Sequence, residues 1–246
     1  MLKTLQNAFK IKEIREKLLY TFFMLVVIRL GSQLPIPGVD TKFFAELFAR
    51  QSSDAFGFFN TITGGSFTNM SVFALSITPY ITSSIIMQLL TIAIPKLEEM
   101  QREGEDGRKK IAEYTRYLTV GLALMQSIAM SVGFGGRGLL IDFNAVSVIV
   151  AIATMTSGSA MLMWIGERIT ERGVGNGISI VLLFNIISTL PSDMITLYER
   201  FLVGKNVPVA TVSLIIILAI ILAMVVFVIV LQDGERRIPV QYSKKM

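Results

Sequence analysis

The chain has 246 residues, 52% hydrophobic and 17% charged, with a mean hydropathy of +0.62 and a formal net charge of +5. Soluble domains usually carry about 25% charged residues. Here the apolar surplus lies in long uncharged blocks, which indicates a membrane protein. The lack of cysteine and histidine excludes disulfides, the usual zinc sites, haem ligation by histidine and Cys or His nucleophiles. We therefore expect no metal and no cofactor.

The chain starts with a basic segment, 1–17, which we expect to remain uncleaved because no small-residue cleavage site follows the first apolar stretch. That stretch, 18–34, is near the short limit for a membrane span and stops at Pro35 and Pro37. It contains Arg29, which we interpret as a residue near a helix end that snorkels to the surface or pairs with a carboxylate.

Residues 55–95 contain no charged residue. One straight helix of that length would reach about 61 Å, roughly twice the hydrocarbon thickness of a bilayer, so it must be broken. The pair Gly64-Gly65 marks the break. We predict a half-helix that enters the membrane and turns, followed by a full span over 71–94 that is kinked at Pro79. Backbone of this kind is tolerated at membrane depth only where protein encloses it or it lines a cavity.

The rest of the chain alternates between charged segments and uncharged blocks. A hydrophilic loop, 96–116, is followed by four further predicted spans, which makes six with the first two, and by a charged tail, 233–246. The four spans are 117–136, 143–166, 173–192 and 206–232. Lysine and arginine number 17 in the loops and tails on the side of the N-terminus and 5 on the other side. This bias predicts that both termini are cytoplasmic, and it explains the basic charge without nucleic acid.

Ionisable chemistry within the spans is sparse. Asp142 and Asp193 sit at span ends, whereas Glu167 and Glu171 lie in a predicted cytoplasmic loop. Proton-coupled transport and intramembrane aspartyl proteolysis generally need ionisable groups at depth, so both become less favoured. We expect no enzyme, because no nucleophile–base pair or metal-ligand set is visible.

Two polar groupings stand out within the spans. The second span carries a stripe that suggests a surface that opens or faces water, formed by Ser76, Thr78, Thr82, Ser83, Ser84 and Gln88. A second group of small residues, 154–159, is explained by close helix packing in lipid. The segment 173–177 has three glycines, which permit close backbone approach or bending. It lacks the Lys-Ser/Thr pair and the preceding strand of a phosphate-binding loop.

Four long strings resemble the SecY family of protein-conducting channels and occur in the family's order. They are FALSITPYITSSIIMQLL at 73–90, REGEDGRKKI at 102–111 with YTR at 114–116, WIGERITERG at 164–173 running on into GNGIS at 175–179, and ERRIPVQY at 235–242. The resemblance implies an all-α membrane protein of two inverted five-helix halves. Residues 18–198 would form the first half, with a plug at 56–68, and span 206–232 would begin the second.

The resemblance also assigns candidate site residues. The pore ring would comprise Ile77, Ile81, Ile178 and Leu182, in two pairs spaced i,i+4 so that each pair shares a helix face. The plug would include Phe58, Phe59, Asn60, Thr61, Ile62, Gly64 and Gly65. One wall of the lateral gate would present Thr82, Ile85 and Gln88. Docking of a SecA motor or a ribosome would use Arg108, Lys109, Lys110, Arg236 and Arg237, although the charged segment 96–116 by itself is equally consistent with a solvated surface.

The implied function is a passive pore in the bacterial cytoplasmic membrane that passes unfolded secretory polypeptides and releases membrane segments sideways into lipid. SecE-like and SecG-like small subunits, signal sequences and secretory precursors would be its partners, with no nucleic-acid role beyond ribosome docking. The family has ten spans and this chain ends after the sixth, so we expect either a fragment of a longer product or half of a split channel. Two alternatives stay open: half of an inverted-repeat secondary transporter, and a truncated product without function.

Overall fold

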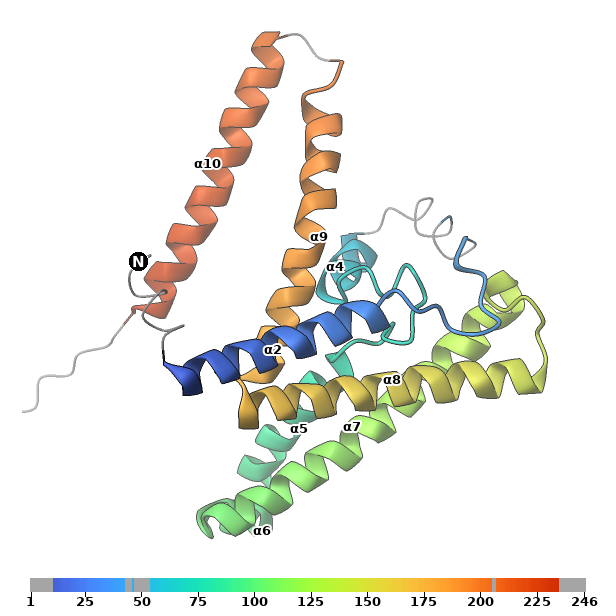
Figure 1. Cartoon of the computed structure of the whole chain (residues 1–246), viewed down its shortest axis with the longest axis vertical. Coiled ribbons are helices and arrows are strands. Elements are labelled where there is room, and N and C mark those ends of the chain that lie inside the picture. The colour runs from blue at the N-terminus through green and yellow to red at the C-terminus, as the bar shows by residue number, and fades with distance from the viewer. Residues whose placement is uncertain (1–10, 43–45, 47–53, 205–206, 235–246) are drawn as a thin grey trace, which may run out of the picture. The chain divides into compact units, whose positions relative to one another are not determined.

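The computed structural model describes residues 11–42, 46, 54–204 and 207–234 (Figure 1). In this part of the chain the regular structure is helical, apart from two isolated bridges, Pro35–Ser71 and Val39–Leu140. The predicted all-α fold is confirmed. The chain forms two compact units, residues 1–189 and 190–246, and each is described by itself.

Helix α2 (Lys12–Gly31) opens the first unit. It begins earlier and ends earlier than the predicted span 18–34. Its end is closed at Ser32, whose backbone N–H donates to the carbonyl of Ile28 at 2.9 Å and whose hydroxyl donates to that of Arg29. The extended segment that follows links two other loops, because Ile36 N–H donates to Met70 O and Ile141 N–H to Gly38 O.

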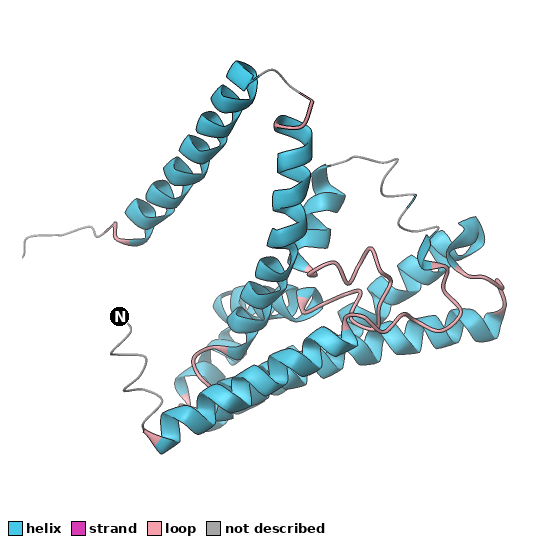
Figure 2. Ribbon diagram, turned by 45° about the horizontal axis from the view of Figure 1, so that its top comes forward, coloured by secondary structure: helices cyan, strands magenta, loops and turns pink. Residues whose placement is uncertain are grey.

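The broken half-helix is present. Helix α4 (Asp54–Ile62) has nine residues and ends just before Gly64 and Gly65, which adopt φ of +66° and +81°. Glycine takes these left-handed angles without a Cβ clash, which explains why the helix stops there. Residues 63–77 then form compact turns rather than a helix, drawn as loops in Figure 2.

The predicted span 71–94 is wrong in its first turns. Helix α5 (Thr78–Ala93) has only 16 residues, and Pro79 lies in its first turn instead of kinking it. Proline suits that position because the missing N–H would have no helical partner there. Pro95 likewise occupies the first turn of the next helix, α6 (Pro95–Arg102). The axes of α5 and α6 are bent by 101° at Ile94, the residue between them.

The predicted loop 96–116 is helical throughout most of its length. Helix α6 covers its first part, and the first turns of α7 (Glu105–Phe134) cover the rest. A Cβ on Gly107 would lie 1.6 Å from the carbonyl oxygen of Met100, so glycine is needed where the two helices meet. After α7 comes a short π-helical turn, η1 (Gly135–Leu139), which contains Gly138 with φ of +110°.

Helices α7 and α8 (Ala145–Arg172) pack against each other (Figure 1). Their contacts include a hydrogen bond between the hydroxyls of Ser127 and Thr156 at 2.9 Å. Near the other end, Arg116 Nε lies 2.8 Å from the Glu167 carboxylate. One apolar cluster, around Met70 and Met155, lies between α7, α8 and the loop segments. A second, around Ile77 and Ile165, joins α8 to α2, α5 and α9 (Gly177–Phe201).

Helix α9 (Gly177–Phe201) begins in the first unit and ends in the second, continuing through Pro191 beyond the predicted span 173–192. The second unit otherwise contains α10 (Val207–Gln232), which matches the predicted span 206–232 closely. By length and composition the described helices provide four membrane spans, or five if the bent pair α5–α6 counts as one. The 20-residue α2 does not meet the same criterion, because its first half carries several charges. The count of six therefore stays a prediction.

Candidate functional site

The candidate ring residue Ile77 lies at the centre of the second apolar cluster. It is fully buried among aliphatic side chains from α2, α8 and α9, including Ile28, Leu162 and Val181. Ile81 and Ile178 pack against the same cluster and are half-buried. Leu182 is half-buried one turn beyond Ile178. The structure thus gathers three of the four candidates around one cluster.

Gly166 of α8 is the point where two candidate ring residues meet. A Cβ placed on it would lie 2.5 Å from Ile178 Cδ1 and 3.5 Å from Ile77 Cδ1. A Cβ on Gly177, the first residue of α9, would lie 2.0 Å from the carbonyl oxygen of Gly166. A side chain at Gly177 would meet the backbone of α8 and hold α9 away from it, so this position requires the smallest residue. At Gly166 the nearest atom is the terminal methyl group of Ile178, which would have to shift to admit a side chain. The predicted close approach at the glycine-rich segment is confirmed at Gly177.

Hydrogen bonds fix how α9 starts. Asn176 Oδ1 accepts from the backbone N–H groups of Ile178 and Ser179, which have no partner within the helix. Thr170 Oγ1 accepts from Gly177 N–H at 2.8 Å, and Thr21 of α2 accepts from Val174 N–H at 3.2 Å. The segment 173–177 is therefore a structural turn that orients Ile178.

The plug candidates form a compact hairpin of α4 and the turns after it. Asn60 Oδ1 accepts from both the backbone N–H and the hydroxyl of Thr68, which closes the hairpin. Phe59 packs edge-on against Phe67, with ring centroids 4.8 Å apart. Thr61 donates back to the Gly57 carbonyl, Ile62 is half-buried, and Phe58 is 69% exposed. The candidates thus divide between groups that close the hairpin and one outward-facing aromatic ring.

Arg29 lies in the last turn of α2, near a helix end as the sequence predicts. Among the described residues its guanidinium meets no carboxylate: Nη1 donates to the carbonyl of Gly64 at 3.1 Å and to the hydroxyl of Ser188 at 3.2 Å. It joins three segments, α2, the plug hairpin and α9. The sequence signal was the single charge within an apolar span, which by itself names no partner.

A buried polar clamp holds the residue just before Ile77. Ser76 has φ of +52°, a left-handed conformation that costs about 1–2 kcal/mol for a residue with a Cβ. Ser159 of α8 donates to its carbonyl at 3.1 Å, and Asn185 Nδ2 of α9 donates to its hydroxyl at 3.2 Å. Sequence reasoning found Ser76 and Ser159 separately and missed Asn185, although an amide inside an apolar span needs partners.

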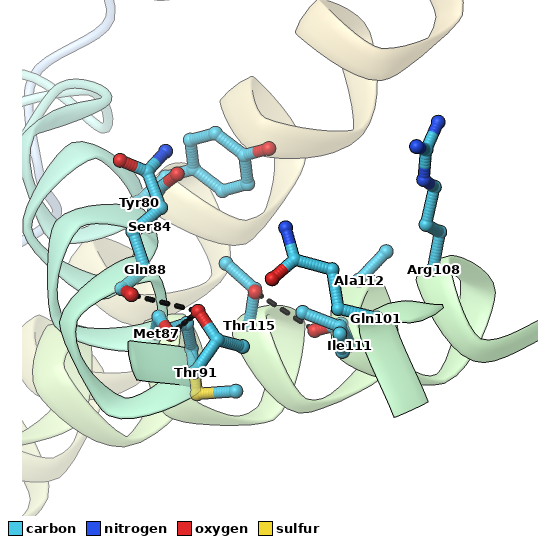
Figure 3. Close-up of a pocket in the computed structure, with 10 residues that line it drawn as sticks. All are labelled: Tyr80, Ser84, Met87, Gln88, Thr91, Gln101, Arg108, Ile111, Ala112 and Thr115. Carbon is cyan, nitrogen blue, oxygen red and sulfur yellow. Dashed lines mark hydrogen bonds between the residues drawn. The ribbon is translucent and has the colours of Figure 1, made fainter. Parts of the chain in front are cut away.

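The lateral-gate candidates lie on α5 but do not join the ring. Thr82 is half-buried and donates to the Thr78 carbonyl, Ile85 is 52% exposed, and Gln88 is exposed. Gln88 lines a pocket of about 300 Å³ between α5, α6 and α7, shown in Figure 3. Its lining is about equally polar and apolar, and the polar residues are Tyr80, Ser84, Gln88, Thr91, Gln101, Arg108 and Thr115. Of the predicted polar stripe only Ser84 and Gln88 line this cavity, whereas Ser76 and Ser83 are buried.

The docking candidates fall into two groups. Arg108, Lys109 and Lys110 are exposed on the first turns of α7, and Lys109 lies 3.8 Å from the carboxylate of Asp106. Arg236 and Arg237 lie outside the described residues. A docking role for either group stays a prediction.

The sequence profile of the SecY family matches residues 71–246, well over half of the chain. The chain belongs to the SecY family. The protein translocase subunit SecY of Bacillus subtilis is 42% identical over 252 residues, covering 99% of this chain and 57% of that protein. The SecY subunit of Corynebacterium glutamicum is 41% identical over 98% of this chain, and that of Pseudomonas aeruginosa is 40% identical over 96%.

Solved structures agree on the fold. The Sec61 channel in a canine ribosome–channel complex has a TM-score of 0.53 at 19% identity, covering 92% of this chain and 49% of that one. Another protein-conducting channel has a TM-score of 0.50 at 20% identity, covering 76% of this chain and 38% of that one. The relatives are named protein translocase subunits, and this member of the family is a multi-pass membrane protein. It spans 57% of the length of the B. subtilis relative.

Proposed function

We propose that this chain forms the N-terminal half of a channel that passes unfolded secretory polypeptides across the bacterial cytoplasmic membrane and releases membrane segments laterally into lipid. The observation that carries the proposal is the meeting of Ile77 and Ile178 over Gly166, next to a non-helical segment that continues into the plug hairpin. Family membership favours this function over the secondary-transporter alternative.

The seal is a branched apolar constriction. Ile77, Ile81, Ile178 and Leu182 would supply this chain's part of a ring around an extended polypeptide. Such a constriction resists ion flow by dewetting, because water in a narrow apolar passage has no hydrogen-bond partners. The plug hairpin, 56–68, would block the passage at rest. Thr82, Ile85 and Gln88 would face the opening through which hydrophobic segments leave.

Partners and orientation complete the proposal. The excess of Lys and Arg on one side supports a cytoplasmic N-terminus. Exposed Arg108, Lys109 and Lys110 support docking of a SecA motor or a ribosome on that side. SecE-like and SecG-like subunits would cover apolar helix surfaces. The remaining wall of the pore and gate would come from the part of the SecY length that this chain does not span.

Site-specific crosslinking tests the proposal. Photoreactive residues replace Ile81 and Ile178 in the full-length channel, assembled in membranes, and a secretory precursor is arrested in transit. We expect crosslinks from both positions to the precursor. The control is Met125 of α7, which is 67% exposed and is not part of the apolar cluster that holds Ile77, Ile81 and Ile178. Precursor crosslinks from Met125 alone, or from none of the three positions, would contradict the pore assignment.

A further inference from the structure

The contacts of Arg29 suggest a role beyond packing. Its side chain is half-buried, and one nitrogen, Nη1, serves both Gly64 O and Ser188 Oγ. Among the described residues its guanidinium forms no salt bridge within 4.0 Å. A charged side chain within a membrane span costs free energy when it has no counter-ion, and such residues are usually functional. The groups that Arg29 contacts therefore indicate its function.

The acceptor carbonyl belongs to the glycine turn of the plug hairpin, which follows α4. Gly64 is buried with φ of +66°, and a Cβ on it would lie 3.1 Å from both Asn185 Cα and Ser188 Oγ. The turn therefore rests directly on α9. Arg29 of α2 donates to the turn, at Gly64 O, and to α9, at Ser188 Oγ. These two hydrogen bonds hold the turn and α9 together.

We propose that Arg29 is a positioning residue that holds the plug turn on α9 while the channel is closed. This inference rests on the proposed function and extends it to a residue of the resting seal. Hydrogen bonds to a charged donor are stronger than neutral ones, which suits a latch. Both acceptors are neutral, so water entering the pore replaces them without leaving an unpaired buried carboxylate behind. The two Arg29 hydrogen bonds therefore persist while water is excluded from the pore, and they break when water enters.

The same turn of α9 reaches the ring. Ser188 Oγ donates to the Asn185 carbonyl at 2.7 Å, and Asn185 Nδ2 donates to Ser76 Oγ, next to Ile77. A displacement of this turn would therefore loosen the plug, through Arg29, and the residue that precedes Ile77, through Asn185. Plug release and widening of the ring become one event.

Arg29→Met tests the latch in the full-length channel, reconstituted in vesicles without precursor. Methionine fills apolar space but donates no hydrogen bond. We measure resting ion conductance, and the mobility of a spin label on Phe58→Cys, an exposed plug position in a chain without native cysteine. We expect conductance and the mobile fraction of the label to rise at least about tenfold, as loss of charged hydrogen bonds implies. Arg29→Lys should rise less, because it keeps the charge and a donor.

Arg137→Met is the matched control, since it removes the same charge from an exposed residue of η1. If Arg29→Met matches this control in both readouts, the latch is wrong. If Arg29→Met does not assemble, Ser188→Ala decides on the same readouts, because it removes one acceptor and leaves the charge in place. Precursor crosslinking from position 81 is measured separately, in a channel that retains Arg29. Failure of the proposed function is therefore distinguishable from failure of the latch.

Discussion

Helices α8 and α10 are of similar length and both are apolar enough to cross a membrane, yet they differ in packing. Nine residues of α8 are buried, among them Gly158, Ser159 and Gly166. None of the described side chains of α10 is buried, although its mean hydropathy is 3.7 against 1.8 for α8. The buried face of α8 carries small and hydroxyl residues, which let neighbouring helices of the first unit approach closely.

The largest expected effect comes from enlarging a buried glycine of α8. A Cβ on Gly158 would lie 2.0 Å from the Val72 carbonyl oxygen, so Gly158→Leu should lower the free energy of unfolding by about 3 kcal/mol or more. Thermal unfolding of the full-length channel in detergent measures it. Gly121→Leu in α7 is the control, because no atom lies within 4 Å of its Cβ position. Equal stability of the two variants would contradict the packing described for α8.

A smaller loss is expected at the plug turn. Gly64→Ala places a Cβ at φ of +66° and 3.1 Å from Asn185 Cα, so we expect a loss of about 1–2 kcal/mol. Gly57→Ala is the matched control: Gly57 lies in α4 with open space around its Cβ position, and alanine favours a helix. Unfolding midpoints of the two variants provide the comparison. A Gly64 variant as stable as the Gly57 variant would mean that the turn does not rest on α9.

Removing one clamp hydroxyl tests the polar contribution of α8. Ser159→Ala takes away the hydrogen bond to the Ser76 carbonyl and should cost about 1 kcal/mol. Ser157→Ala should change stability little, because its hydroxyl is exposed and bonds only within its own helix. The difference between the two unfolding midpoints checks this. A zero difference would indicate that the hydrogen bond from Ser159 does not stabilise the strained Ser76.

The smallest effect is expected on α10. Val225 is 50% exposed, and Val225→Leu should change the free energy of unfolding by less than about 0.5 kcal/mol. The same thermal assay of the full-length channel applies. If Val225→Leu lowered the free energy of unfolding as much as Gly158→Leu, α10 would have to be tightly packed. The difference in packing between α8 and α10 would then be wrong.

Much of the fold follows from the sequence. The uncharged blocks place α7, α8, α9 and α10 to within a few residues at most ends, and Gly64-Gly65 marks the end of α4. Two local predictions failed for identifiable reasons. The apolar run predicts a span over 71–94 kinked at Pro79, but residues 71–77 are held in turns by tertiary hydrogen bonds such as Val72 N–H to Leu34 O. The segment 96–116 was assigned to a loop because it is charged, yet charged residues form good solvent-facing helices.

Contacts between residues far apart in the chain were harder to predict than the helices themselves. Arg29, Ser76, Asn185 and Ser188 are far apart in the chain, and no spacing rule connects them. The ring candidates came from family resemblance, since an isoleucine in a span is ordinarily a core or lipid-facing residue.

The sequence by itself determined that this protein is helical, enters the membrane several times, breaks its second apolar block at a glycine pair and belongs to the SecY family. These properties are local or compositional, because backbone polar groups in lipid must be satisfied within each segment. Only the tertiary structure decided which glycines are contact points, that Arg29 binds a plug carbonyl instead of a carboxylate, and that Ser76 is clamped from two helices. Those contacts depend on distances between segments that are remote in sequence, and these distances are set by packing.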